Sequence, residues 1–113
     1  MAIDEYGFGR IVVDGREERR DLIITAAGIH SNWWRKEGHA LSLEDLDPVI
    51  EARPEVLVVG TGADGNMRPA AGLAKDLSAL GIDAEFLSTR DAVDRFNELL
   101  GVRNVAAALH LTC

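Results

Sequence analysis

The segment that most constrains the fold of this chain is residues 56–65, with the sequence VLVVGTGADG. A short β-branched run that ends in glycines predicts a buried strand opening into a tight loop. Glycine adopts positive φ at little cost and lets another group come close to the main chain. We therefore expect a loop shaped by close approach, either of a ligand or of a neighbouring strand.

Helix and strand patterns alternate after residue 42. Capping residues, apolar stripes and terminal glycines predict three helices. The first covers residues 42–52 and starts with a capping box at Ser42 and Asp45. The second is opened by Pro69 and ended by Gly81, and the third is capped by Ser88 or Thr89 and ended by Gly101. Apolar or alternating runs predict strands at residues 55–60, 82–87 and 104–112. Such alternation is typical of a largely parallel sheet with helices on both faces.

Two more strands are expected near the start of the chain. Residues 11–13 and 21–25 are short apolar runs, and the turn signal at residues 14–15 predicts that they pair as an antiparallel hairpin. We interpret the charged residues 16–20 as a solvated turn or strand end. The expected architecture is one three-layer α/β/α domain, residues 1–113, with a mixed, mostly parallel sheet of about five strands.

The length, charge and apolar runs of the chain limit the kinds of binding partner that we expect. The 113 residues suit one domain, and their formal net charge of −7 repels nucleic acid and anionic lipid surfaces. No apolar run reaches the roughly 20 residues that span a bilayer, and no leader segment is recognised. We therefore expect a cytoplasmic protein without a nucleic-acid or membrane partner. The single cysteine, Cys113, forms no internal disulfide, which is consistent with a reducing compartment.

The glycine loop is the first candidate binding site, because ligands of open α/β sheets bind beyond the carboxyl ends of the strands. Gly60, Thr61 and Gly62 would present backbone N–H groups to an anion near the start of the next helix. However, the third glycine, Gly65, has the wrong spacing for a dinucleotide loop, and Asp64 adds a negative charge. The alternative is structural, with glycines that let the strand turn sharply beneath a helix.

Trp33, Trp34 and Arg35 form the second candidate. Aromatic rings and a guanidinium can line a pocket and pair with a carboxylate or a phosphate. The alternative is core packing of the tryptophans beside a solvated Arg35. In a strand, one tryptophan would face inward and the other outward, and an exposed tryptophan would indicate a ligand or partner surface.

His110 is the candidate for proton transfer, and the alternative is a hydrogen-bonded structural histidine. His30, His39 and Cys113 are the other residues that invite a metal or nucleophile hypothesis. On a strand, residues three apart point to opposite faces, so we do not expect His110 and Cys113 to converge. The sequence therefore predicts neither a metal site nor a cofactor.

Ordered motifs along nearly the whole chain resemble those of one small family. They are YGFG at residues 6–9, IVVDG at 11–15, WWR at 33–35, GH at 38–39, PEVLVVGTG at 54–62, GID at 81–83, Thr89, Ala92, Phe96, Asn97, and ALHLTC at 108–113. Together they resemble the domain of unknown function shared by the adipogenesis-associated protein and mitochondrial complex I assembly factor 3.

The resemblance implies an α/β/α domain with no established activity or cofactor in most members. It maps the family's glycine loop onto residues 60–62, its tryptophan-arginine segment onto Trp34 and Arg35, and its ending onto His110 and Cys113. It also implies a binding role, because the mitochondrial relatives assist assembly of a respiratory complex and do not act as enzymes.

Two functions remain in competition. The leading hypothesis is a non-enzymatic binding or assembly module with a protein partner. The alternative is an enzyme or binding protein for a small anionic metabolite at the rim of residues 60–65, with Arg35 pairing the anion, Thr61 orienting it and His110 moving a proton. A concave pocket shared by those three side chains would favour the alternative, whereas an apolar patch around Trp33 or Trp34 would favour a protein partner.

Overall fold

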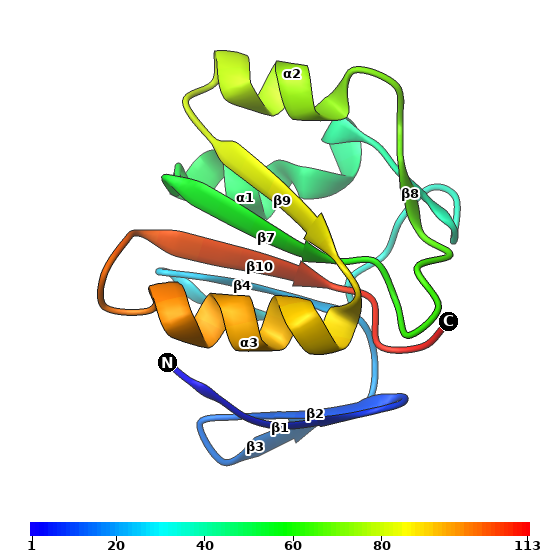
Figure 1. Ribbon diagram of the computed structural model, residues 1–113, viewed down its shortest axis with the longest axis vertical. Helices are drawn as coiled ribbons and strands as arrows, with labels where there is room; N and C mark the ends of the chain where they lie inside the picture. The colour runs from blue at the N-terminus through cyan, green and yellow to red at the C-terminus, as the bar shows by residue number, and fades with distance from the viewer.

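The computed structural model describes residues 1–113 and contains a central sheet (Figure 1). This sheet has five strands. Their order is β5 (Gly28–His30), β4 (Leu22–Thr25), β10 (Val105–Leu109), β7 (Val56–Gly60) and β9 (Asp83–Leu87). Strands β10, β7 and β9 are parallel, whereas β4 pairs antiparallel with both β10 and β5. The sheet is mixed, as expected, but it is not mostly parallel, because half of its pairings are antiparallel.

Three helices accompany the sheet: α1 (Asp47–Ala52), α2 (Leu73–Ala79) and α3 (Thr89–Leu99). A 3₁₀ turn, η1 (Leu43–Leu46), leads into α1, and the expected capping box is formed by Ser42 and Asp45. At α3, Ser88 is the N-cap and its hydroxyl accepts a hydrogen bond from the Asp91 amide. No helix has the length and apolar composition that crossing a bilayer requires.

The two faces of the central sheet are covered differently (Figure 1). Helices α1 and α2 pack on one face, in a cluster of twelve buried residues that includes Leu57 and Ala106. On the other face, α3 is joined by a separate antiparallel sheet of β1 (Ile3–Gly7), β2 (Arg10–Val13) and β3 (Arg16–Glu18). The three-layer α/β/α arrangement is therefore not confirmed, because a helix and a small sheet share the second face.

The expected hairpin between residues 11–13 and 21–25 is wrong. The turn at Asp14 and Gly15 is present, with φ of 50° and 77°, but β2 pairs with β1 and with the charged β3. Residues 22–25 form β4 in the central sheet instead. A charged segment can serve as an edge strand because one of its faces stays in water.

Pro69 does not open a helix. It lies in β8 (Arg68–Pro69), which pairs with β6 (Ala40–Leu41), and α2 begins only at Leu73. The neighbouring amides of Arg68 and Ala70 donate to the carbonyls of His39 and Leu41. Proline has no amide hydrogen to donate. It is tolerated here because the hydrogen bonds between the two strands use the amides of Arg68 and Ala70. The pairing of β6 with β8 connects residues 39–41 by hydrogen bonds to the loop that follows β7.

Candidate functional site

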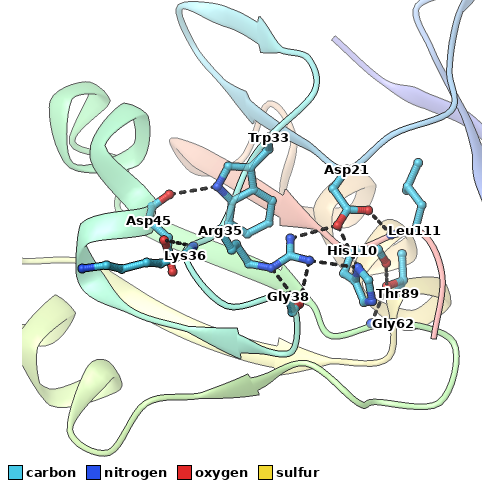
Figure 2. A network of polar contacts seen from close by, with 10 residues as sticks. All are labelled: Asp21, Trp33, Arg35, Lys36, Gly38, Asp45, Gly62, Thr89, His110 and Leu111. Atoms are coloured by element: carbon cyan, nitrogen blue, oxygen red, sulfur yellow. Dashed lines mark hydrogen bonds and ion pairs between the residues drawn. The ribbon is translucent and has the colours of Figure 1, made fainter.

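A partly buried contact between Asp21 and His110 joins the start of β4 to the end of β10 (Figure 2). Leu22 lies opposite Leu109 in the antiparallel pairing, so the next residues outward, Asp21 and His110, face each other. Asp21 Oδ2 lies 2.8 Å from His110 Nδ1, and Asp21 Oδ1 accepts a hydrogen bond from the Leu111 amide at 2.8 Å. Both oxygens of the carboxylate are therefore bonded to the segment that follows β10.

Arg35 completes this cluster from a third segment (Figure 2). Its Nη1 lies 2.9 Å from Asp21 Oδ2, and its Nε and Nη2 donate to the Gly38 carbonyl at 3.1 and 2.9 Å. The guanidinium stacks 4.7 Å from the centre of the Trp33 ring, and the Arg35 side chain is only 6% exposed. The core-packing hypothesis for the tryptophans expected Arg35 to be solvated. The structure buries the Arg35 side chain instead.

The contact between Arg35 Nη2 and His110 Nδ1, at 3.3 Å, is a close approach between two donors. The shorter contact to Asp21 takes the Nδ1 proton, which leaves no lone pair on Nδ1 for the arginine. Nη2 donates to Gly38 instead. Asp21 thus lies between two nitrogen donors and compensates the buried guanidinium.

These contacts shift the pKa of Asp21. Burial alone raises the pKa of the carboxyl, because it disfavours the charged form. The hydrogen bonds from His110, Leu111 and Arg35 act in the opposite direction and outweigh burial, so the pKa lies below its ordinary value of 3.8. The carboxylate is accordingly ionised at neutral pH.

The far side of the His110 ring is enclosed. The side chain is 8% exposed, and its Nε2 is buried without a hydrogen-bond partner. The ring meets that of His39 edge-on at 5.9 Å between centroids, and its Cδ2 faces Gly62. Since Nδ1 is bonded and Nε2 is covered, neither nitrogen is presented to a substrate in solution.

The group that approaches the glycine loop is the segment of residues 112–113. The amides of Ala63 and Asn66 donate to the carbonyls of Thr112 and Cys113 at 2.7 and 3.0 Å. Gly62 has φ of 106°, and a Cβ there would lie 2.6 Å from both the carbonyl carbon and the oxygen of Cys113. Residues 112–113 thus occupy the loop where an anion was considered.

Thr89 connects the same loop to the residue that follows β10 through two hydrogen bonds. Its buried hydroxyl accepts from the Gly62 amide at 2.9 Å and donates to the His110 carbonyl at 2.6 Å (Figure 2). Gly60 is equally constrained, because a Cβ there would lie 2.9 Å from the Thr89 hydroxyl. The candidate residues Gly60 and Gly62 therefore pack against the protein.

The six candidate residues do not converge on one pocket. Arg35, His110 and Gly62 lie close together, but the Thr61 hydroxyl donates to the Leu87 carbonyl at 2.9 Å. Neither Thr61 nor His110 lines the hollow beside Arg35. The shared pocket that would favour an enzyme is not formed by these three side chains.

The expectation that His110 and Cys113 point apart assumed a strand through residue 112. Strand β10 ends at Leu109, and both residues then lie against Gly62. The thiol remains free. No group of three or more histidine, cysteine or acidic side chains is placed to hold a metal ion.

A shallow hollow of about 430 Å³ lies beside the ion-pair cluster. Its aromatic and charged lining residues are Arg20, Asp21, Trp33, Trp34, Arg35 and Lys36. Trp33 is half-buried and donates from Nε1 to the Asp45 carbonyl at 2.9 Å, whereas Trp34 is 79% exposed. The two tryptophans face inward and outward as expected, although their segment is not a strand.

Sequence reasoning missed Asp21. An acidic residue directly before the buried run LIIT was the available signal. It becomes informative only when β4 is paired antiparallel with β10, which places Asp21 opposite His110. The partner strand expected for residues 21–25 was a different one, so the pair was not found.

The fold is shared with known proteins. The sequence profile of a family described as a protein of unknown function (DUF498/DUF598) matches residues 3–110. The chain belongs to this family. An uncharacterised protein of Rhodobacter capsulatus is 34% identical to it over 110 residues, which are 96% of this chain and 83% of the relative.

Solved structures of similar proteins have the same fold. A conserved hypothetical protein from Pyrococcus horikoshii superposes with a TM-score of 0.84 at 27% identity, covering 100% of both chains. A Bartonella henselae protein described as an outer membrane protein gives a TM-score of 0.82 at 32% identity, covering 98% of this chain and 94% of its own. The resemblance to a family of unknown function is thus confirmed at the level of DUF498.

Proposed function

We propose that this DUF498 member is a non-enzymatic binding module that contacts a protein partner through the hollow around Trp34. The observation that carries the proposal is the 79% exposure of that side chain. A tryptophan in water forgoes the favourable burial of a large ring, and tryptophan is enriched among the residues that dominate binding energies. An exposed tryptophan at the wall of a hollow is therefore a suitable anchor for a partner.

The surroundings of Trp34 favour binding because they are already ordered. Its neighbours Trp33 and Arg35 are fixed by hydrogen bonds to Asp45 and Gly38 and by the ion pair with Asp21. A surface that is rigid before association loses less conformational entropy when a partner arrives.

The alternative, an enzyme or small-molecule binder at residues 60–65, has less support. The Ala63 and Asn66 amides of that loop are bonded within the chain, and both nitrogens of His110 are enclosed. An anion would have to displace residues 112–113, and a substrate would find no accessible base.

The resemblance to the adipogenesis-associated protein and complex I assembly factor 3 also supports a binding function. The mitochondrial relatives in the family of the adipogenesis-associated protein and complex I assembly factor 3 act as binding proteins during assembly. We extend that kind of role to this chain as an assembly or binding factor. We propose the cytoplasm as its compartment, because a single cysteine suits reducing conditions.

The test is affinity capture from a lysate of the source organism with three purified baits. They are the wild type, Trp34→Ala, and Phe8→Ala as a control for another exposed aromatic residue. We expect at least one protein, identified by mass spectrometry, on the wild-type and Phe8→Ala baits but not on Trp34→Ala. Identical capture by all three baits, or no specific capture by any, would contradict the proposal.

A ligand screen tests the alternative directly. Melting temperatures of the wild type would be measured with nucleotides, sugar phosphates and carboxylates, because a ligand at about 100 times its Kd adds roughly 2.7 kcal/mol of stability. If the proposed function is correct, none of these ligands should raise the melting temperature. A stabilising metabolite whose effect is lost in Arg35→Ala but kept in Trp34→Ala would favour the small-molecule function instead.

A further inference from the structure

The hollow around Trp34 is basic although the protein is acidic. The chain has a formal net charge of −7, yet the hollow is lined by the three cations Arg20, Arg35 and Lys36 and by a single carboxylate, that of Asp21. Asp21 is already bonded by His110, Leu111 and Arg35. Its charge is therefore compensated within the protein, and the outward-facing charges are those of Arg20 and Lys36.

These two cations are available to a partner. Arg20 is exposed and forms no ion pair, whereas the nearby Arg16 and Arg19 pair with Glu18 and Glu17. Lys36 has a side chain that is 76% exposed, and its contact with Glu44 is a long exposed pair of 3.4 Å. Exposed pairs of this kind contribute little and are easily exchanged for another carboxylate.

We propose that the hollow binds an acidic segment of a partner protein. Carboxylates of the segment pair with Arg20 and Lys36, and an apolar side chain between them packs on the Trp34 ring. This inference rests on the proposed function and specifies its partner class. The net negative charge of the protein repels such a segment elsewhere, so electrostatic attraction favours its approach to the cations of this hollow.

A protein segment suits the hollow better than a small anion does. The Nε and Nη2 of the buried Arg35 guanidinium donate to the Gly38 carbonyl, and Asp21 compensates its charge. Nη1 has no hydrogen-bond partner besides its ion pair with Asp21, but it is covered by the protein and is not presented to a small ligand in the hollow. The available contacts are at the rim, on separate side chains, beside a flat exposed ring. An extended chain can reach several such points at once, and it covers a shallow surface that would leave a metabolite in water.

The test is fluorescence anisotropy with three labelled peptides of equal length. One alternates glutamate with leucine and phenylalanine, the second replaces each glutamate with glutamine, and the third replaces each with lysine. The proteins are the wild type, Trp34→Ala, the double variant Arg20→Glu with Lys36→Glu, and a control double variant, Arg53→Glu with Lys75→Glu. The control makes the same change of net charge at exposed cations that do not line the hollow.

We expect the acidic peptide to bind the wild type and the control, and binding to weaken as salt is raised. It should bind at least tenfold more weakly to the Arg20 and Lys36 double variant, and more weakly to Trp34→Ala. Circular dichroism of each variant checks that the fold is kept.

Several outcomes would overturn the inference. They are equal binding by the two double variants, preference for the lysine peptide, no binding of any peptide, and displacement of the acidic peptide by citrate or phosphate at equal concentration. Preferential binding of the glutamine peptide that depends on Trp34 would overturn the acidic partner class while leaving the proposed function intact. Binding of the acidic peptide that is equal in the wild type and Trp34→Ala would overturn both this inference and the proposed function.

Discussion

Asp21 Oδ2 lies 2.8 Å from His110 Nδ1, although 89 residues separate the two in the chain. The pair joins the first residue before β4 to the first residue after β10, and Arg35 brings a third segment to the same carboxylate. The contact therefore fixes the tertiary arrangement of three distant segments. It also orders the segment on which Trp34 is exposed.

Replacement of Asp21 with asparagine should strongly destabilise the protein. The variant keeps the size of the side chain but leaves the buried guanidinium of Arg35 without a counter-charge, and breaking a buried pair in this way costs about 3 kcal/mol. The measurement is the free energy of unfolding from urea titration at pH 7. Glu17→Gln is the control, since it removes a carboxylate that is paired at the surface with Arg10 and Arg19. A loss no larger than that of the control would show that the ion pair does not stabilise the fold.

Stability should fall in acid, and part of that fall should depend on Asp21. The folded-state pKa of Asp21 lies below its ordinary value of 3.8, so the unfolded state binds more protons there. The contribution of Asp21 is therefore present above about pH 5 and is lost as the pH falls through the folded-state pKa. Urea unfolding between pH 7 and pH 3 should show a smaller acid loss in Asp21→Asn than in the wild type.

The comparison with the variant is needed because the pKa values of Glu17 and Glu55 are also lowered, by hydrogen bonds to Arg10 and to the Asn104 amide respectively. Those residues contribute equally to both proteins. Parallel pH profiles for the wild type and the variant would contradict a lowered pKa for Asp21.

Gly62→Ala should destabilise the protein much more than Gly65→Ala. Both glycines have positive φ, which costs an alanine about 1 kcal/mol or more. Only at Gly62 would the new Cβ also collide with backbone, at 2.6 Å from Cys113, whereas at Gly65 the nearest atom lies 3.8 Å away. The expected loss at Gly62 is about 3 kcal/mol, measured by urea unfolding. Equal losses at the two positions would mean that residue 113 does not pack on the loop.

Trp33→Ala should destabilise the protein strongly, whereas Trp34→Ala should leave its stability almost unchanged. Trp33 is half-buried, donates to the Asp45 carbonyl and stacks on Arg35, so its loss should cost about 3 kcal/mol. Trp34 is exposed, and its truncation should change stability by less than about 0.5 kcal/mol. Thermal unfolding of the two variants measures both effects. A large loss in Trp34→Ala would assign that ring to packing and remove it as a binding anchor.

Local patterns predicted the elements well where one residue type has a single physical role. The capping box at Ser42 and Asp45, the N-cap at Ser88, and the positive φ of Gly81 and Gly101 all occur as expected. The fully buried strand over residues 56–60 also follows from its apolar run. These features depend on neighbours in sequence, so the sequence was sufficient to find them.

Predictions failed where pairing decided the outcome. The apolar residues of β2 suited a hairpin with residues 21–25, but the charged β3 took that position. Pro69 has the φ of a first helical residue, yet the same φ is accommodated in β8. In both cases two local conformations were compatible with the residues, and contacts with distant segments selected one.

By itself, the sequence determined a mixed α/β fold, the position of the glycine loop and the presence of Trp34 and Arg35 in one segment. The tertiary structure alone decided what surrounds them. It filled the glycine loop with residues 112–113, paired His110 with Asp21, buried Arg35 and left Trp34 in water. The reason is physical: backbone conformation follows from local sterics and capping, whereas burial and ion pairing depend on which distant strands become neighbours.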